Sequence, residues 1–260
     1  MKFAVLGDPV SHSRSPAIHN AALAAAGISG VYEARRVDAA GVREAFDELR
    51  SGELAGFNVT MPHKALAAEL SDHLDTDAEL AGSVNTVKLI DGAVWGFSTD
   101  IGGVRDAWGE LPAAGPILIL GSGGAAAAAC VALADRQMYI AARRFGAGTG
   151  LAGELRQRGL AIESGEVHWG VPVVGAVVVN CTPVGMSGEE IPADVLALSS
   201  GLFDMAYGPD ATPAVETLRN MGLPVVNGLE LLVAQAARSF RIWTGLVPPL
   251  AAMTKAAKNP

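Results

Sequence analysis

ILILGSGGAAAAACVALA, residues 117–134, places an apolar run, a glycine-rich turn and an alanine-rich run in direct succession. This order predicts a buried strand over Ile117–Leu120 and a helix over Ala125–Ala134. The turn between them fits the pattern G-x-G-x-x-A, which indicates dinucleotide binding when it joins a strand to a helix. The stretch therefore predicts a dinucleotide-binding unit in this part of the chain.

Each position of the turn has a physical task at such a site. Gly121 permits the tight turn, Gly123 lets the backbone approach a pyrophosphate, and the small Ala126 lets helix and strand pack closely. The first helical turn then offers free N–H groups and a partial positive charge to the anion. We expect five residues to form this cofactor loop: Gly121, Ser122, Gly123, Gly124 and Ala125. The alternative is an ordinary glycine-rich turn between a strand and a helix.

The sequence about 20 positions after the turn bears on which dinucleotide is bound. An NAD site has an acidic residue there, which binds the ribose 2′-hydroxyl. This chain has Ala141-Ala142-Arg143-Arg144, which offers no carboxylate. Arg143 and Arg144 can hold a 2′-phosphate, because guanidinium groups bind phosphate through several donors in one plane. The pair favours NADP over NAD, against the alternative of two exposed surface arginines.

Strand and helix patterns alternate on both sides of the glycine turn. Before it, we expect strands over 2–6, 31–37 and 56–60, helices over 15–27, 40–49 and 64–70, and a hairpin over 84–97 that turns at Asp91-Gly92. After it, we expect a strand over 138–142, buried parallel strands over 173–180, 202–205 and 224–226, and helices over 151–158, 213–220 and 229–244. The pattern predicts an α/β fold of two units with a cleft between them.

The composition limits the class of protein. The chain has 260 residues, of which 50% are hydrophobic and 18% charged, and this suits a packed core rather than disorder. Its net charge of −8 argues against a nucleic-acid surface. Cys130 and Cys181 are isolated and the five histidines show no ligand spacing, so we predict a cytoplasmic protein without disulfides or metal. The uncharged stretch 111–134 is broken by Pro116 and by glycines, so we expect no membrane span.

Polar side chains gather at the predicted strand ends in the first hundred residues. Ligands of an open α/β sheet bind at such ends, and hydroxyls and amides suit a small polyhydroxylated substrate. Oxidising a secondary alcohol needs a base for the hydroxyl proton and an acceptor for the hydride. Lys64 is the candidate base, and Asp100 would orient its ammonium and bind the substrate hydroxyl. The alternative is a solvated Lys64 at a helix start and Asp100 as a helix cap.

Several of these segments together resemble the shikimate dehydrogenase family. They follow the family order, from residue 3 to about 245, and comprise SRSP (13–16), NVTMPHK (58–64), GSVNT (82–86), TD (99–100), GSGGA (121–125), DMAY (204–207) and NGL (227–229) with Gln235. The N-V-T-x-P-x-K segment with the later T-D is far more specific than the glycine turn.

The resemblance implies a reaction and a set of site residues. The reaction is the reversible, NADP-linked reduction of 3-dehydroshikimate to shikimate, in the biosynthesis of aromatic amino acids, with Lys64 as acid/base group and Asp100 as its partner. Met205 and Gly228 would lie along the nicotinamide. Six residues would hold the substrate carboxylate and hydroxyls: Ser13 and Ser15 for the carboxylate, with Thr60, Asn85, Tyr207 and Gln235.

The resemblance also implies a division of labour along the chain. Residues 1–101 plus 238–260 would form the substrate-binding and catalytic domain. Residues 102–237 would form an NADP-binding Rossmann domain inserted between them, with the cofactor in the cleft. The ligands would be small molecules, and the enzyme would be a monomer or a homodimer.

Two departures from the family pattern leave alternatives open. Ser98 stands where the family usually has Asn before Thr-Asp, and Ala142 and Arg144 flank Arg143 where the family usually has Asn-Arg-Thr. One alternative is a relative that acts on quinate or an amino-substituted shikimate and can use NAD. The other is a non-catalytic protein that binds the dinucleotide and senses a metabolite. Such a sensor would have little reason to keep both Lys64 and Asp100.

Overall fold

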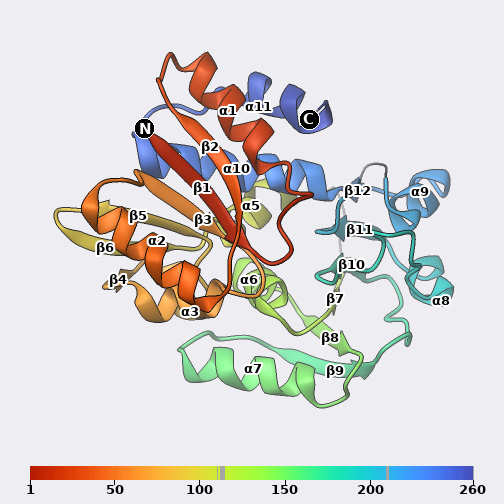
Figure 1. Cartoon of the computed structure of the whole chain (residues 1–260). Helices are drawn as coiled ribbons and strands as arrows, with labels where there is room; N and C mark the ends of the chain where they lie inside the picture. Colours follow the sequence, from red (N-terminus) through yellow and green to blue (C-terminus); the bar gives the residue numbers. More distant parts are fainter. Residues whose placement is uncertain (110, 112–114, 209–210, 260) are drawn as a thin grey trace. The chain divides into compact units, whose positions relative to one another are not determined.

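The computed structural model describes residues 1–109, 111, 115–208 and 211–259, and in it the chain divides into two compact units (Figure 1). Unit 1 joins Met1–Gly103 to Leu232–Pro260, and unit 2 is the continuous segment Val104–Leu231. The chain leaves unit 1 within helix α5 (Thr99–Trp108) and returns within helix α10 (Gly228–Thr244). Both units combine helices with a sheet, so the predicted α/β class is confirmed.

Unit 1 is built on a six-stranded mixed sheet with the order β2-β1-β3-β5-β6-β4. β1 runs parallel to β2 and β3, whereas β5 runs antiparallel to β3 and β6. The carboxyl ends of β3 and β6 and the amino end of β5 therefore lie together, with Thr86 paired to Asn58 on one side and to Phe97 on the other. The strands are β1 (Lys2–Gly7), β2 (Val31–Arg36), β3 (Gly56–Val59), β4 (His73–Leu74), β5 (Thr86–Ile90) and β6 (Ala93–Phe97).

Local signals in the sequence explain where several elements of unit 1 begin and end. The Asp38 side chain caps α2 by accepting hydrogen bonds from the Ala40 and Gly41 amides, each at 3.0 Å. The β5–β6 turn has positive φ at Asp91 (51°) and Gly92 (83°), as an Asp-Gly hairpin turn requires. The helices of unit 1, besides parts of α5 and α10, are α1 (Ser15–Ala25), α2 (Ala39–Ser51), α3 (Lys64–Leu70), α4 (Thr76–Ala81) and α11 (Leu250–Lys258).

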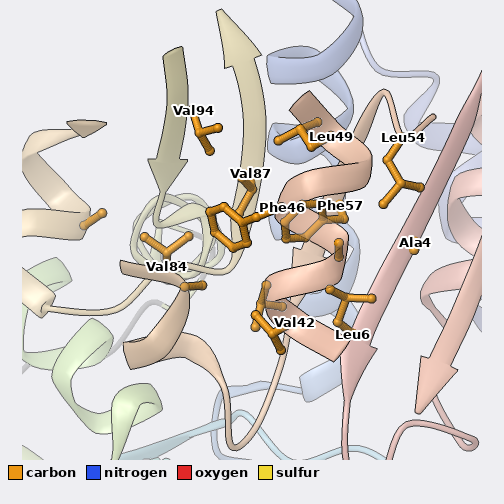
Figure 2. Close-up of a cluster of buried hydrophobic side chains, with 14 residues drawn as sticks. Ala4, Leu6, Val42, Phe46, Leu49, Leu54, Phe57, Val84, Val87 and Val94 are labelled. Atoms are coloured by element: carbon orange, nitrogen blue, oxygen red, sulfur yellow. The ribbon is translucent and has the colours of Figure 1, made fainter. Parts of the chain in front are cut away.

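One core of unit 1 forms where α2 covers the sheet (Figure 2). One face of this helix is buried: Val42, Ala45, Phe46 and Leu49. The Phe46 ring meets the Phe57 ring of β3 edge to face, with centroids 5.3 Å apart. Burying one such side chain stabilises a fold by about 1.5–3 kcal/mol. This packing holds β3 in place, and with it the residues that follow the strand.

Unit 2 is a six-stranded sheet with the order β12-β11-β10-β7-β8-β9, and every neighbouring pair in it is parallel. Read from β9, this is the order 3-2-1-4-5-6 of a dinucleotide-binding Rossmann fold, in which the strand order reverses between β7 and β10. The elements are β7 (Ile117–Leu120), α6 (Gly124–Ala132), β8 (Met138–Ala142), α7 (Ala147–Gln157), β9 (Ser164–His168), β10 (Val177–Asn180), α8 (Ala193–Ala197), β11 (Gly201–Asp204), α9 (Pro213–Asn220) and β12 (Val225–Val226).

The structure corrects the prediction for unit 2 in two places. The strand expected from residue 173 begins only at Val177, because residues 174–175 form a turn in which Gly175 has a φ of 72°. The strand β9 and the short helix α8 were not predicted at all. β9 is a polar edge strand, and the apolar run that indicates a buried strand is missing from it.

No helix in the described part of the chain combines the length and the apolar character that a bilayer crossing needs. The stretch 111–134 contains β7 and most of α6. Its residues 112–114 lie outside the described residues.

Candidate active site

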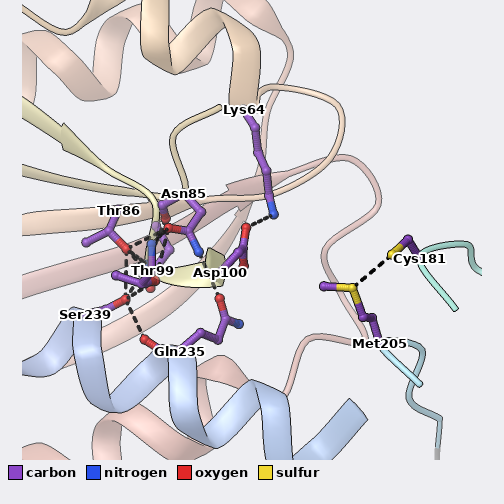
Figure 3. Close-up of polar contacts among 10 residues, drawn as sticks. Lys64, Asn85, Thr86, Thr99, Asp100, Cys181, Met205, Gln235 and Ser239 are labelled. Atoms are coloured by element: carbon purple, nitrogen blue, oxygen red, sulfur yellow. Dashed lines mark hydrogen bonds and ion pairs between the residues drawn. The ribbon is translucent and has the colours of Figure 1, made fainter. Parts of the chain in front are cut away.

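The carboxyl ends of β3 and β6 bring two predicted residues of unit 1 together. Lys64 begins α3, five residues after β3 ends, and Asp100 lies in the first turn of α5, just after β6. The Lys64 Nζ donates to the Asp100 Oδ2 at 2.5 Å (Figure 3). The Lys64 side chain is 22% exposed and that of Asp100 is 12% exposed. His63 helps to fix this turn through a 2.9 Å hydrogen bond between its Nε2 and the Val37 carbonyl.

A second pair of predicted residues, Asn85 and Gln235, also meets in unit 1. The Asn85 Nδ2 donates to the Gln235 Oε1 at 2.9 Å, which connects the start of β5 with α10. The Asn85 Oδ1 accepts from the Thr99 amide at 2.8 Å, at the residue before Asp100. The Asn85 side chain thus joins the segment that carries Asp100 to the helix that carries Gln235 (Figure 3).

A buried polar network beneath this pair is centred on Ser239, a residue that the sequence patterns did not single out. Ser239 is only 1% exposed, and its Oγ lies 2.8 Å from the Thr86 Oγ1 and 3.2 Å from the Thr99 Oγ1. It also accepts from the Asn58 Nδ2 at 3.1 Å and donates to the Gln235 carbonyl. Ser239 follows Gln235 by four positions and so lies on the same face of α10, and that spacing is the signal that could have identified it.

The remaining predicted substrate residues of unit 1 follow the strands β1 and β3. Ser13 lies in the loop after β1, and its Oγ accepts from the Ser15 amide at 3.3 Å. Ser15 begins α1 and is mostly buried. Thr60 directly follows β3, and its amide donates to the Leu6 carbonyl. Within the described residues, none of these hydroxyls is hydrogen-bonded to Lys64 or Asp100.

The glycine turn of unit 2 has an open backbone at the start of α6. Gly121 has a φ of 116°, which favours glycine, and its amide donates to the Ala141 carbonyl at 2.8 Å. Gly123 caps α6 without any side-chain hydrogen bond, and the first turn of the helix carries no acidic residue. A Cβ added at Gly123 would meet nothing within 4 Å, so its backbone is open. Open glycine backbone beside an uncapped helix N-terminus fits a bound pyrophosphate.

Arg143 and Arg144 lie in the loop that follows β8, the strand next to β7 in the sheet. Both side chains are exposed. Among the residues that the structure describes, neither guanidinium forms an ion pair. The two groups are therefore available to an anionic ligand of unit 2, and a 2′-phosphate suits them.

The segment Met205–Tyr207 follows β11 and is held by the buried Asp204. Its carboxylate accepts from the Thr212 hydroxyl at 2.5 Å, the Asn180 side-chain amide at 2.8 Å and the Ala206 amide at 3.0 Å. Burial raises the pKa of Asp204, and these hydrogen bonds oppose the shift. The Met205 Sδ lies 3.4 Å from the Cys181 Sγ, at the end of β10 (Figure 3).

Gly228 lies against this segment, because a Cβ added there would clash with the Ala206 carbonyl and come within 3.0 Å of the Met205 carbonyl. A side chain at this position would displace the backbone of the Met205 segment. Unit 2 therefore brings the predicted residues Met205 and Gly228 together.

Ser98, which departs from the family pattern, is 4% exposed and directly follows β6.

No group of three or more His, Cys, Asp or Glu side chains within the described residues is placed to hold a metal ion. Both cysteines are free thiols.

Comparisons with known proteins identify the family of this chain. The model of the shikimate dehydrogenase substrate binding domain matches residues 5–87, and that of the shikimate 5′-dehydrogenase C-terminal domain matches residues 228–258. Shikimate dehydrogenase (NADP(+)) of Citrifermentans bemidjiense is 37% identical over 97% of this chain and 92% of its own length.

Solved structures of shikimate 5-dehydrogenases share the fold over nearly the whole chain. That of Thermus thermophilus, in complex with NADP(H) and shikimate, has a TM-score of 0.88 and 34% identity, covering 99% of this chain and 98% of its own. That of Listeria monocytogenes, in complex with shikimate and NAD, has a TM-score of 0.83 and 28% identity, covering 98% and 95%. The resemblance read from the sequence is confirmed: the chain belongs to the shikimate dehydrogenase family.

Proposed function

We propose that this chain catalyses the reversible, NADP-linked reduction of 3-dehydroshikimate to shikimate. The observation that carries the proposal is the contact between Lys64 and Asp100 at the strand ends of unit 1. Family membership gives the reaction, since relatives of 35–37% identity over nearly the full chain bear the name shikimate dehydrogenase (NADP(+)). A lysine–aspartate pair supplies the proton chemistry that an alcohol oxidation requires.

Lys64 exchanges the proton of the reacting hydroxyl, and Asp100 holds the lysine in position. NADP, when bound, supplies the hydride chemistry at its nicotinamide. The 2.5 Å contact fixes the Nζ, while the exposed part of each side chain leaves room for the substrate hydroxyl. A base that is already positioned contributes about 10²–10⁴-fold to the rate of such a step.

The hydrogen-bond network sets which atoms of Asn85 and Gln235 face the substrate. The Gln235 Oε1 accepts from Asn85, so its Nε2 remains as a donor for a substrate hydroxyl or carboxylate. The Asn85 Oδ1 is taken by Thr99, so Asn85 offers only its second N–H. Four further residues complete the proposed substrate site: Ser13 and Ser15 for the carboxylate, with Thr60 and Tyr207.

Unit 2 holds the cofactor in this proposal. The turn from Gly121 to Ala125 binds the pyrophosphate, Arg143 and Arg144 bind the 2′-phosphate, and Met205 and Gly228 lie along the nicotinamide. The proposed substrate-binding and catalytic domain is residues 1–101 plus 238–260, and the proposed NADP-binding domain is residues 102–237. These bounds differ from the two compact units at residues 102–103 and 232–237, which belong to unit 1 and include Gln235.

The test is to follow NADPH absorbance during oxidation of shikimate by the purified chain. We expect the highest kcat/KM for shikimate with NADP⁺. Ser98 replaces the family Asn next to the reaction centre, so quinate and an amino-substituted shikimate are compared under the same conditions, with NADP⁺ and NAD⁺. A higher kcat/KM for either would transfer the proposal to that substrate. Cofactor binding without turnover of any of them would instead indicate a metabolite sensor.

A further inference from the structure

The loop between β8 and α7 carries Arg143 and Arg144, and its position decides where their guanidinium groups lie. The loop has four residues, 143–146, and ends at Gly146, whose φ of 94° requires a left-handed backbone. Gly146 is the N-cap of α7 but has no side chain to cap it, and the first turn of α7 has no acidic residue. The amides at the start of α7 must find an acceptor elsewhere.

Glu166, in the middle of the neighbouring edge strand β9, supplies that acceptor. Its Oε1 accepts from the Gly146 amide at 2.8 Å and from the Gly148 amide at 2.9 Å. Its Oε2 accepts from the Thr149 amide at 3.3 Å and from the Thr149 hydroxyl at 2.7 Å. One carboxylate thus ties the end of the arginine loop and the first turn of α7 to the sheet.

This arrangement decides what Glu166 can and cannot do for a ligand. A carboxylate has about four lone-pair sites, and four hydrogen bonds occupy those of Glu166. It has none left for the ribose hydroxyls of NAD, although it lies next to the loop where an NAD site has its acidic residue. The same bonds occupy the helix amides that would otherwise attract a phosphate. The guanidinium groups of Arg143 and Arg144 remain as the phosphate-binding groups.

A second contact connects the loop with β9. The Phe145 ring stacks on the His168 ring with centroids 4.1 Å apart and an interplanar angle of 18°. His168 follows Glu166 by two positions and so lies on the same face of the strand. Phe145, which follows the two arginines, therefore packs against the same face of β9 that binds the start of α7.

We propose that Glu166 is a positioning residue for the 2′-phosphate of NADP: it anchors the loop that presents Arg143 and Arg144 and is itself withheld from the ribose. The inference rests on the proposed use of NADP. The hydrogen bond from the Thr149 hydroxyl, with those from the three amides, also lowers the pKa of Glu166, which keeps the carboxylate in its acceptor form.

The test measures Kd for NADP⁺ and for NAD⁺ by calorimetric titration of the whole chain, without turnover. We expect Glu166→Ala to weaken NADP⁺ binding about tenfold while Kd for NAD⁺ changes less than about twofold, because only NADP⁺ needs the arginines in place. Thr149→Val removes one anchoring bond without changing any charge, and we expect it to weaken NADP⁺ about threefold. Thr149→Ser keeps the hydroxyl and should restore the wild-type Kd.

The outcomes of the titration separate the proposed role of Glu166 from its alternatives. Unchanged or tighter NADP⁺ binding in Glu166→Ala would overturn the inference, because the carboxylate would then act only by repelling the phosphate. If Glu166→Ala weakened the binding of NADP⁺ and NAD⁺ equally, the inference would also be overturned, because Glu166 would then have only a general structural role. If Glu166→Ala does not fold, the pair Thr149→Val and Thr149→Ser decides alone. A wild-type chain that binds NADP⁺ but leaves shikimate unchanged would remove the proposed reaction and leave this inference open to the same titration.

Discussion

Lys64 and Asp100 stand 36 positions apart in the sequence, yet their charged groups touch. The Lys64 side chain is 22% exposed, whereas Asp100 is buried, so removing the lysine leaves a buried carboxylate without its partner. At the residue scale, a substitution therefore affects both turnover and folding, and the two effects are measured separately.

We expect Lys64→Ala to lower kcat by about 10²–10⁴-fold, because the positioned proton donor and acceptor is lost. KM for shikimate should change little. The free energy of unfolding should fall by about 1–3 kcal/mol, because the buried Asp100 loses its partner. Steady-state kinetics and denaturant unfolding measure the two effects. Asp100→Asn, which keeps an oxygen acceptor near the Lys64 Nζ, serves as the companion variant and should lose less of kcat. Near-normal turnover in Lys64→Ala would contradict the assignment.

Arg143→Ala should raise KM for NADP⁺ about tenfold and leave KM for NAD⁺ nearly unchanged. A charge-assisted hydrogen bond contributes about 1.5–3 kcal/mol, and solvent at this exposed position reduces that contribution. Saturating NADP⁺ should restore kcat, since the lost contact is remote from the reacting atoms. Parallel increases of KM for the two cofactors would show that the guanidinium does not distinguish them.

The residues of the site differ in how visible they are in the sequence. The contact between Lys64 and Asp100 could be expected, because both follow predicted strands whose ends meet. For Ser239 the only signal is its spacing of four from Gln235, and for Glu166 there is none, because their partners are 181 and 17–20 positions away in the chain. A serine within a helix or a glutamate on an edge strand is ordinary until the fold supplies such partners.

At the scale of elements, α10 connects the network under the site with the rest of unit 1. Ser239→Ala would remove a buried hydroxyl that contacts Thr86, Thr99 and Asn58, and a buried polar group left without its partner costs about 1–3 kcal/mol. We expect the free energy of unfolding to fall by about that amount. KM for shikimate should rise about threefold, because Gln235 is one turn away on the same face.

Thr244→Ala is the matched control for this variant. The Thr244 hydroxyl also donates to the carbonyl four residues earlier in α10, that of Phe240, at 2.8 Å. It contacts none of the proposed substrate residues. It should leave KM for shikimate unchanged. A Ser239→Ala enzyme with normal KM and reduced stability would limit Ser239 to a structural role.

The elements also differ in how far their sequences reveal them. β7 and α6 could be predicted because an apolar run, a glycine turn and small residues all point the same way. β9 could not, since its sequence SGEVH is polar and only its pairing with β8 makes it a strand. The strand expected from residue 173 was too long because valines on either side of a glycine turn still read as one apolar run.

At the scale of the whole molecule, the chain leaves unit 1 and returns to it through two helices that also serve the site. α5 carries Asp100 in its first turn, and α10 carries Gln235. The boundaries between the units fall within these helices, at 103/104 and 231/232. Sequence reasoning found two α/β series but could not fix these boundaries, because a helix that passes from one unit to the other shows no break in its pattern.

Stability of the whole chain depends on pH through a histidine that no proposed reaction uses. His19 of α1 is 2% exposed, stacks on the Tyr32 ring at 4.3 Å and lies 5.2 Å from the Trp243 ring. Burial lowers its pKa from 6.5 to about 3. Between pH 6.5 and about pH 3, His19 is protonated in the unfolded chain and neutral in the folded chain. The free energy of unfolding therefore falls as the pH drops below 6.5, and this contribution is fully present only above it.

From pH 7.5 to pH 5, this single group should lower the free energy of unfolding by about 2 kcal/mol. His19→Phe keeps a ring in the stack and removes the titration, so wild type minus variant isolates the effect from that of the carboxylates. We expect the difference, measured by denaturant unfolding, to be flat above pH 7 and to slope by about 1.4 kcal/mol per pH unit between pH 6 and 4. His73→Phe is the control, because that ring is exposed and lies outside the stack. If the free energy of unfolding changed with pH in the same way for wild type and His19→Phe, His19 would be protonated in the folded chain as well. Its ring would then be less firmly enclosed between α1, β2 and α10 than its contacts indicate.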